Sequence, residues 1–151
     1  MQLKNENKNV YPKTAISSHI LIARRNSNQV VQSGAIQFPI IERESNYFSI
    51  TNNYSKFIAK KKMVVLIIGN INFYSFAANN FFVRVAIYKN GYDIGNRIPA
   101  NKVMNWQPIH ISGIVELDVD DYIEIVSVSD SSVEIAANNY DGTYINIIPI
   151  L

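Results

Sequence analysis

Apolar and polar residues alternate along much of this chain, in segments of strand length. Valine or isoleucine stands at every second position of residues 83–88. The stretch from Ile111 to Ile125 shows the same alternation twice, on either side of an acidic segment at residues 118–121. A period of two places every second side chain on one face of a β-strand, so these segments predict strands with one buried face.

Turn-forming residues separate the segments at short intervals, and no long segment has the 3.6-residue period of a helix. Asn90-Gly91 is a strong hairpin signal directly after the strand at residues 83–88. Met63 to Ile68 is apolar at every position, which predicts a strand buried on both faces. A last strand is expected between Tyr144 and Leu151, with Pro149 near its end or at a sheet edge. This pattern predicts an all-β sandwich.

Composition is consistent with a single folded domain. The chain has 151 residues, 48% of them hydrophobic, and no cysteine. Residues 1–15 are polar and are expected to form an N-terminal arm and attachment segment, with the folded domain at 16–151. A net charge of +2 is too small to predict binding to nucleic acid. No signal peptide or membrane-spanning segment is expected, because the longest apolar run is too short.

From residue 34 onward the order of motifs resembles the globular heads of the complement component one q-type and tumour necrosis factor-like superfamily. The segments that carry the resemblance are Tyr54–Ile58, Met63–Phe73, Val85–Gly91, Ile111–Ile125 and Thr143–Ile147. The resemblance implies a jelly-roll β-sandwich that packs as a tight homotrimer. Asp120-Asp121 stands where the family pattern has Gly-Asp, so this turn is expected to form without glycine.

Similar heads occur on bacteriophage fibres and on bacterial spores, so the resemblance implies a non-enzymatic structural or binding module. The expected role is a bacteriophage virion accessory protein: a fibre head, receptor-binding tip or capsid decoration, assembled in the bacterial cytoplasm. Its expected partners are further copies of itself, other virion proteins through the N-terminal arm, and host surface polysaccharide or protein. Alternatives are a bacterial cell-surface or spore-coat head and, from another class, a carbohydrate-active enzyme on a jelly roll.

The final strand has apolar residues on both faces, whereas the core between two sheets needs only one. One face carries Ile145 and Ile147. The second face, which is predicted to lie at the trimer interface, carries Tyr144, Asn146, Ile148 and Ile150.

Two aromatic residues are candidates for ligand contact, because an aromatic ring with a polar group favours interfaces. Trp106 is expected in a polar loop at residues 101–108, as a ligand contact or a subunit anchor. Tyr92 follows the Asn90-Gly91 turn and is expected to be exposed.

No catalytic residue and no cofactor is expected. His19 and His110 are the only histidines, and no nucleophile or zinc motif accompanies them. Asp118, Asp120 and Asp121 are expected to form a solvated turn, and a calcium site is the alternative. Lys56 and the cluster at residues 60–62 are interpreted as charges that protect a hydrophobic strand from aggregation, with an anionic partner as the alternative.

Overall fold

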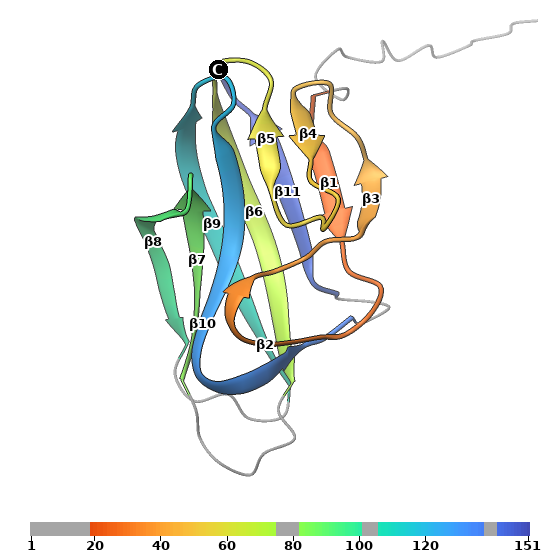
Figure 1. Ribbon diagram of the computed structural model, residues 1–151, viewed down its shortest axis with the longest axis vertical. Helices are drawn as coiled ribbons and strands as arrows, with labels where there is room; N and C mark the ends of the chain where they lie inside the picture. The colour runs from red at the N-terminus through yellow and green to blue at the C-terminus, as the bar shows by residue number, and fades with distance from the viewer. Residues whose placement is uncertain (1–18, 75–81, 101–105, 138–141) are drawn as a thin grey trace, which may run out of the picture.

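The chain folds into antiparallel β-strands. The computed structural model describes residues 19–74, 82–100, 106–137 and 142–151, with side chains except at positions 74, 96–100, 106 and 131. Across these ranges it forms eleven strands and no helix, so none of these residues belongs to a helix able to cross a membrane. The strands are β1 (Leu21–Arg24), β2 (Gln29–Ala35), β3 (Ile40–Arg43), β4 (Phe48–Ile50), β5 (Phe57–Ala59), β6 (Met63–Tyr74), β7 (Val83–Lys89), β8 (Tyr92–Ala100), β9 (Trp106–Leu117), β10 (Tyr122–Ile135) and β11 (Tyr144–Pro149) (Figure 1).

The strands form two layers of one curled sheet. The first layer has the order β9–β6–β11–β1–β3, with every neighbouring pair antiparallel. In the second layer β8 and β7 lie on one side of β10, while β2, β5 and then β4 lie on its other side. The layers join where the end of β10 pairs with the end of β6. This arrangement is a jelly roll, and it confirms the predicted all-β class.

The hydrophobic core lies between the two layers and is filled by every second residue of the strands. Phe38 and Phe57 pack there with their ring centroids 6.1 Å apart. Burying one such large side chain contributes about 1.5–3 kcal/mol, so this core is the main source of stability. The largest fully buried side chains are Leu21, Ile36, Phe38, Phe57, Ile67, Ile71, Phe73, Ile87, Ile111, Leu117, Ile123 and Ile125.

Strand β6 differs from the sequence prediction. Met63, Val65 and Ile67 are buried, but Leu66 is only half-buried and Ile68 is 37% exposed. The prediction that both faces of this segment are buried is therefore wrong for the single chain. The physical reason is that only one face of β6 packs against the second layer, whereas the other face is the outside of the sandwich.

Two turns have the backbone geometry that the sequence predicts. Asn90 and Gly91 both have positive φ, 53° and 81°, as a two-residue hairpin between β7 and β8 requires. Asp120, in the turn between β9 and β10, has a φ of 70°. Aspartate accepts this left-handed conformation more readily than most residues, so the turn forms without the glycine of the family pattern, as expected. Pro149 is the last residue of β11, where the ladder no longer needs its N–H.

Candidate functional site

The outside of the first layer presents a continuous surface built from four strands. We call this surface the outer face; it comprises the side chains of β9, β6, β11 and β1 that alternate away from the core. The residues of the outer face are Ile22, Arg24, Val64, Leu66, Ile68, Asn70, Pro108, His110, Ser112, Ile114, Glu116, Tyr144, Asn146 and Ile148.

One level of the outer face is apolar across three neighbouring strands. Leu66 on β6 lies opposite Ile114 on β9 and opposite Ile148 on β11. Ile114 is 63% exposed, and the other two side chains are half-buried. The next level adds Ile68 of β6, flanked by Ser112. A contiguous apolar surface of this kind on the central strands of a sheet is typical of an interaction site.

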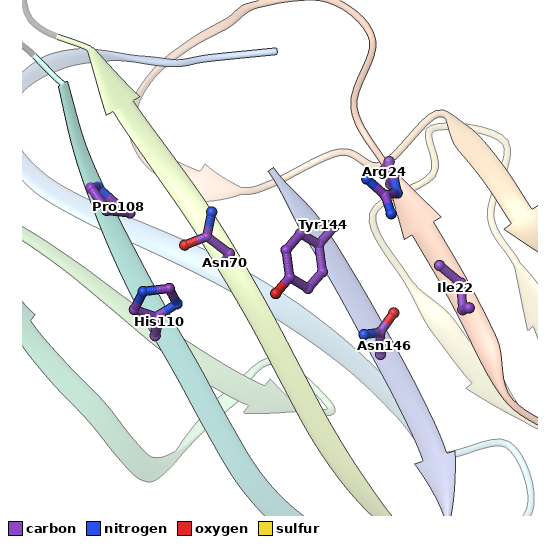
Figure 2. Close-up of a pocket in the computed structure, with 7 residues that line it drawn as sticks. All are labelled: Ile22, Arg24, Asn70, Pro108, His110, Tyr144 and Asn146. Carbon is purple, nitrogen blue, oxygen red and sulfur yellow. The ribbon is translucent and has the colours of Figure 1, made fainter. Parts of the chain in front are cut away.

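The other end of the outer face is polar and hollowed. A pocket of about 610 Å³ opens there, and its lining comes from all four strands (Figure 2). Register explains the grouping, because His110, Asn70, Tyr144 and Arg24 occupy one level across β9, β6, β11 and β1. The pocket therefore presents imidazole, amide, phenol and guanidinium groups side by side. The lining residues are Ile22, Arg24, Asn70, Pro108, His110, Tyr144 and Asn146.

Local contacts hold the polar groups of this pocket in place. The Arg24 Nε lies 2.8 Å from a carboxylate oxygen of Glu42 on β3, and the guanidinium lies 5.6 Å from the centre of the Tyr144 ring. The Asn70 side-chain amide donates a 3.0 Å hydrogen bond to the side-chain oxygen Oδ1 of Asn72. Arg24 is thus oriented by one carboxylate and one aromatic ring, and Asn70 by its strand neighbour.

The residues predicted to form a trimer interface fall on this surface. Tyr144, Asn146 and Ile148 belong to the outer face and are half-buried in the single chain. Ile150 is exposed just beyond the end of β11, where its N–H donates to the Val64 carbonyl at 2.9 Å. Their part in an interface stays a prediction, but the structure places Ile148 opposite Leu66, which in turn lies opposite Ile114. Sequence analysis did not group these residues.

The two aromatic ligand candidates lie elsewhere. Tyr92 begins β8 and is 78% exposed, as expected. Trp106 is the first residue of β9 and pairs with Tyr74 on β6, so its assignment to a loop is wrong. The polar neighbours and Pro108 hide this strand start in the sequence. The Trp106 side chain lies outside the described part of the structure, so its predicted contact role stays a prediction.

The acidic turn directs its carboxylates towards lysines. Asp118 lies 3.1 Å from the Lys62 ammonium, and Asp121 lies 2.8 Å from that of Lys89. Hydrogen bonds from Lys89 and Asn90, together with the Asp118 N–H, lower the pKa of Asp121 to about 2. Hydrogen bonding to Asp118, with a smaller contribution from neighbouring Glu116, raises the pKa of Lys62. Asp118 and Asp121, two of the three acids in the alternative calcium site, therefore pair with different lysines, and the expectation of a solvated turn stays a prediction.

The predicted lysine cluster is divided among different contacts. The Lys56 ammonium lies 4.2 Å from the centre of the Tyr122 ring, and that of Lys61 lies 3.2 Å from the Tyr47 ring. The Lys62 ammonium pairs with Asp118 of the acidic turn, as described above. Of the lysines in the described ranges, Lys60 alone makes neither an ion pair nor a ring contact.

The two histidines lie in different surroundings. The His19 ring stacks on Tyr47 with centroids 4.1 Å apart, whereas His110 lines the outer-face pocket. Within the described ranges, no three histidine or acidic side chains gather as a metal site would require. Sequence analysis assigned His110 no functional role. Alternation alone indicates that His110 points outward, but only strand register brings it beside Asn70 and Tyr144.

Comparison with solved structures identifies the fold. The crystal structure of murine APRIL at pH 8.5 superposes with a TM-score of 0.58 and 10% sequence identity, covering 87% of this chain and 98% of that one. Rabbit GITRL gives a TM-score of 0.55 and 19% identity, covering 87% of this chain and 94% of that one. Neither a protein-family model nor a curated protein matches the sequence. The fold is therefore the tumour necrosis factor-like jelly roll.

Proposed function

We propose that this protein is a non-enzymatic structural or binding module that assembles as a homotrimer through its outer face. The observation that carries the proposal is the apolar level formed by Ile114, Leu66 and Ile148, which a single chain leaves open to solvent. Contiguous apolar surface is costly to expose to water, so a partner that covers it gains free energy.

The position of this surface defines how a partner binds. Strand β6 is paired on both sides, with β9 and β11, so its backbone hydrogen bonds are already made. A partner therefore binds by side-chain packing and not by adding a strand to an edge. Stable interfaces of this packed type bury roughly 2,000 Å² or more in total and resemble a domain core.

The outer face also favours a second copy of the same chain over an unrelated partner. Its apolar level and its polar level are stacked along the strands. Cyclic symmetry about an axis that runs along the strands would bring each level against the same level of the neighbouring copies. The Leu66 level then meets apolar surface, and the Asn70 and His110 level meets hydrogen-bonding groups, as buried polar groups need. The number three comes from the family resemblance and the shared jelly-roll fold.

The biological role that we propose for this module is that of a bacteriophage virion accessory protein, located in the virion after assembly in the bacterial cytoplasm. The support is the resemblance of its motifs to virion and spore heads, combined with the self-complementary outer face. Residues 1–15 would contact other virion proteins. Mass spectrometry of phage particles purified from the bacterium that carries the gene should detect the chain, and its recovery only from the cell envelope would favour the bacterial surface alternative.

The assembly proposal is tested by placing a charge on the apolar level. Ile114→Asp adds a carboxylate at a position that is exposed in the single chain, so the fold should tolerate it. Under the proposal this charge becomes buried on assembly, which is strongly unfavourable. Size-exclusion chromatography with light scattering should show a monomer for Ile114→Asp and a trimer for Tyr92→Asp, the control on the exposed β8 start. Equal assembly of both variants would contradict the proposal.

A further inference from the structure

A second concave surface lies away from the outer face, between two edge strands of the curled sheet. Strands β3 and β4 are the two ends of the strand order, and they lie near each other in the fold (Figure 1). A groove of about 340 Å³ opens between them. We call it the edge groove. Its floor is apolar, with Leu21 and Phe48 buried and Ile41 and Ile50 packed against the core.

The rim of the edge groove contains an aromatic residue in a strained conformation. Tyr54 has a φ of 56°, a left-handed backbone that a bulky side chain rarely adopts and that glycine adopts freely. Two hydrogen bonds hold it: its N–H donates to the Thr51 carbonyl at 2.8 Å, and its carbonyl accepts from Phe38 N–H at 2.9 Å. The side chain is 41% exposed and lines the groove.

The strained backbone at Tyr54 indicates that its aromatic ring has a role in the groove. The loop geometry alone would be satisfied better by glycine, yet the sequence has a large aromatic residue there. Strained residues that the surrounding structure holds in place occur preferentially at ligand sites. The ring presents an apolar surface and a hydroxyl at the rim, which suits contact with a ligand that is itself both apolar and polar.

Three further rim side chains have free hydrogen-bonding capacity. Glu44, Asn46 and Lys60 line the groove, are exposed, and make no side-chain hydrogen bond or ion pair within the described residues. The carboxylate only accepts, the ammonium only donates, and the amide does both. Lys60 is also the single described lysine without an ion pair or ring contact. Its ammonium group can therefore donate hydrogen bonds to a ligand in the groove.

We propose that the edge groove binds one unit of a saccharide. A sugar hydroxyl both donates and accepts, so a hydroxyl-rich ligand satisfies Glu44, Asn46 and Lys60 together. The C–H face of the sugar ring packs on Tyr54 and on the apolar floor. A volume of about 340 Å³ is at the lower end of small-ligand pockets and suits a single ring. This inference goes beyond the proposed assembly and does not depend on it, because the groove shares no residue with the outer face.

The test uses the full chain with chitotriose, cellotriose and a galacturonic acid trimer as probes. Saturation-transfer NMR should detect binding of at least one of them below about 10 mM. Tyr54→Gly removes the ring and suits the left-handed backbone, so affinity should fall about tenfold or more while the unfolding midpoint is retained or raised. Tyr54→Asn is the second variant, because asparagine also tolerates this conformation.

Phe82→Ala is the matched control, since it removes an exposed aromatic ring outside the groove and should leave affinity unchanged. Three outcomes would overturn the saccharide site. They are no binding of any probe at about 10 mM, unchanged affinity in both Tyr54 variants, or binding of a tripeptide but of no saccharide. Light scattering on the same samples reports assembly separately, so failure of the groove is distinguishable from failure of the trimer.

Discussion

At the scale of single residues, Gly69 shows how tightly the first layer is packed. A Cβ atom at this position in β6 would lie 3.0 Å from the Tyr144 carbonyl oxygen and 3.1 Å from a methyl group of Ile111. The carbonyl belongs to the backbone of β11, so it cannot move without disturbing the ladder. A side chain here therefore requires the β11 backbone and the Ile111 methyl group to shift by a few tenths of an ångström.

We predict that Gly69→Ala lowers the free energy of unfolding by about 1–3 kcal/mol, the usual cost of overpacking a core. Urea denaturation followed by circular dichroism measures this change. Ser132→Ala, at an exposed position of β10, is the control and should change stability by less than about 0.5 kcal/mol. Equal stability of Gly69→Ala and the parent protein would contradict the packing described here.

Asp121 links stability to acidic pH. Its pKa is about 2 in the folded chain, below the ordinary value of 3.8, because it accepts hydrogen bonds from Lys89, Asn90 and the Asp118 N–H. A carboxylate with a depressed folded-state pKa stabilises the fold above its unfolded pKa. This contribution is lost as the pH falls from about 4 to about 2.

We predict that Asp121→Asn is less stable than the parent protein by about 0.5–1 kcal/mol near neutral pH, a value reduced by solvent screening. The difference should shrink as the pH falls through about 4 and approach zero only below about 2, because the folded parent carboxyl is half protonated at its pKa of about 2. Thermal melts at several pH values measure it. Asp120→Asn, which changes a neighbouring acid that lacks these hydrogen bonds, is the control; the same profile for both variants would argue against the assignment.

At the scale of elements, two turns are joined by one asparagine. The Asn90 side chain donates to Asp121 at 2.7 Å and accepts from the Tyr122 N–H at 2.9 Å. Its backbone N–H also donates to the Tyr122 carbonyl at 3.0 Å. The β7–β8 hairpin and the β9–β10 turn therefore support each other at one end of the second layer.

We predict that Asn90→Gly destabilises the protein by about 1–2 kcal/mol, even though glycine suits the left-handed turn, because two side-chain hydrogen bonds are lost. Chemical denaturation measures the effect. Asn52→Gly, an exposed turn position between β4 and β5, should be close to neutral by comparison. A neutral Asn90→Gly would mean that backbone conformation alone accounts for asparagine at this turn.

Sequence alternation was sufficient to predict those strands whose apolar face is uninterrupted. Strand β7 and the arms of the β9–β10 hairpin follow directly from it, as does the turn at Asn90. Strand β8 was not predicted, because Gly95, Asn96 and Pro99 interrupt its pattern. The beginning of β9 was assigned to a loop for a similar reason. Propensity describes a single strand poorly when partner strands supply the hydrogen bonds and packing that stabilise it.

The candidate surfaces were less predictable than the strands. Tyr144 and Ile148 could be placed on the second face of the last strand from alternation alone. Their neighbours Leu66, Ile114 and His110 could not, because strand register depends on contacts between residues far apart in sequence. The edge groove was not predicted at all, since it depends on the approach of β3 and β4 and on the left-handed backbone at Tyr54.

At the scale of the whole molecule, the jelly roll leaves one face of its first layer unused by its own core. The chain has a complete core between its layers, and apolar surface continues outside it at Leu66, Ile68 and Ile114. A monomer would leave that surface in water. A trimer would cover it, and would bury both faces of Met63–Ile68 as the sequence pattern predicts.

Sedimentation velocity of the full chain at micromolar concentration tests this account most directly. The account predicts a single species with about three times the chain mass of 17.1 kDa, with no change in mass on moderate dilution. A species that remains at 17.1 kDa across the concentration range would contradict the proposed assembly and the function built on it.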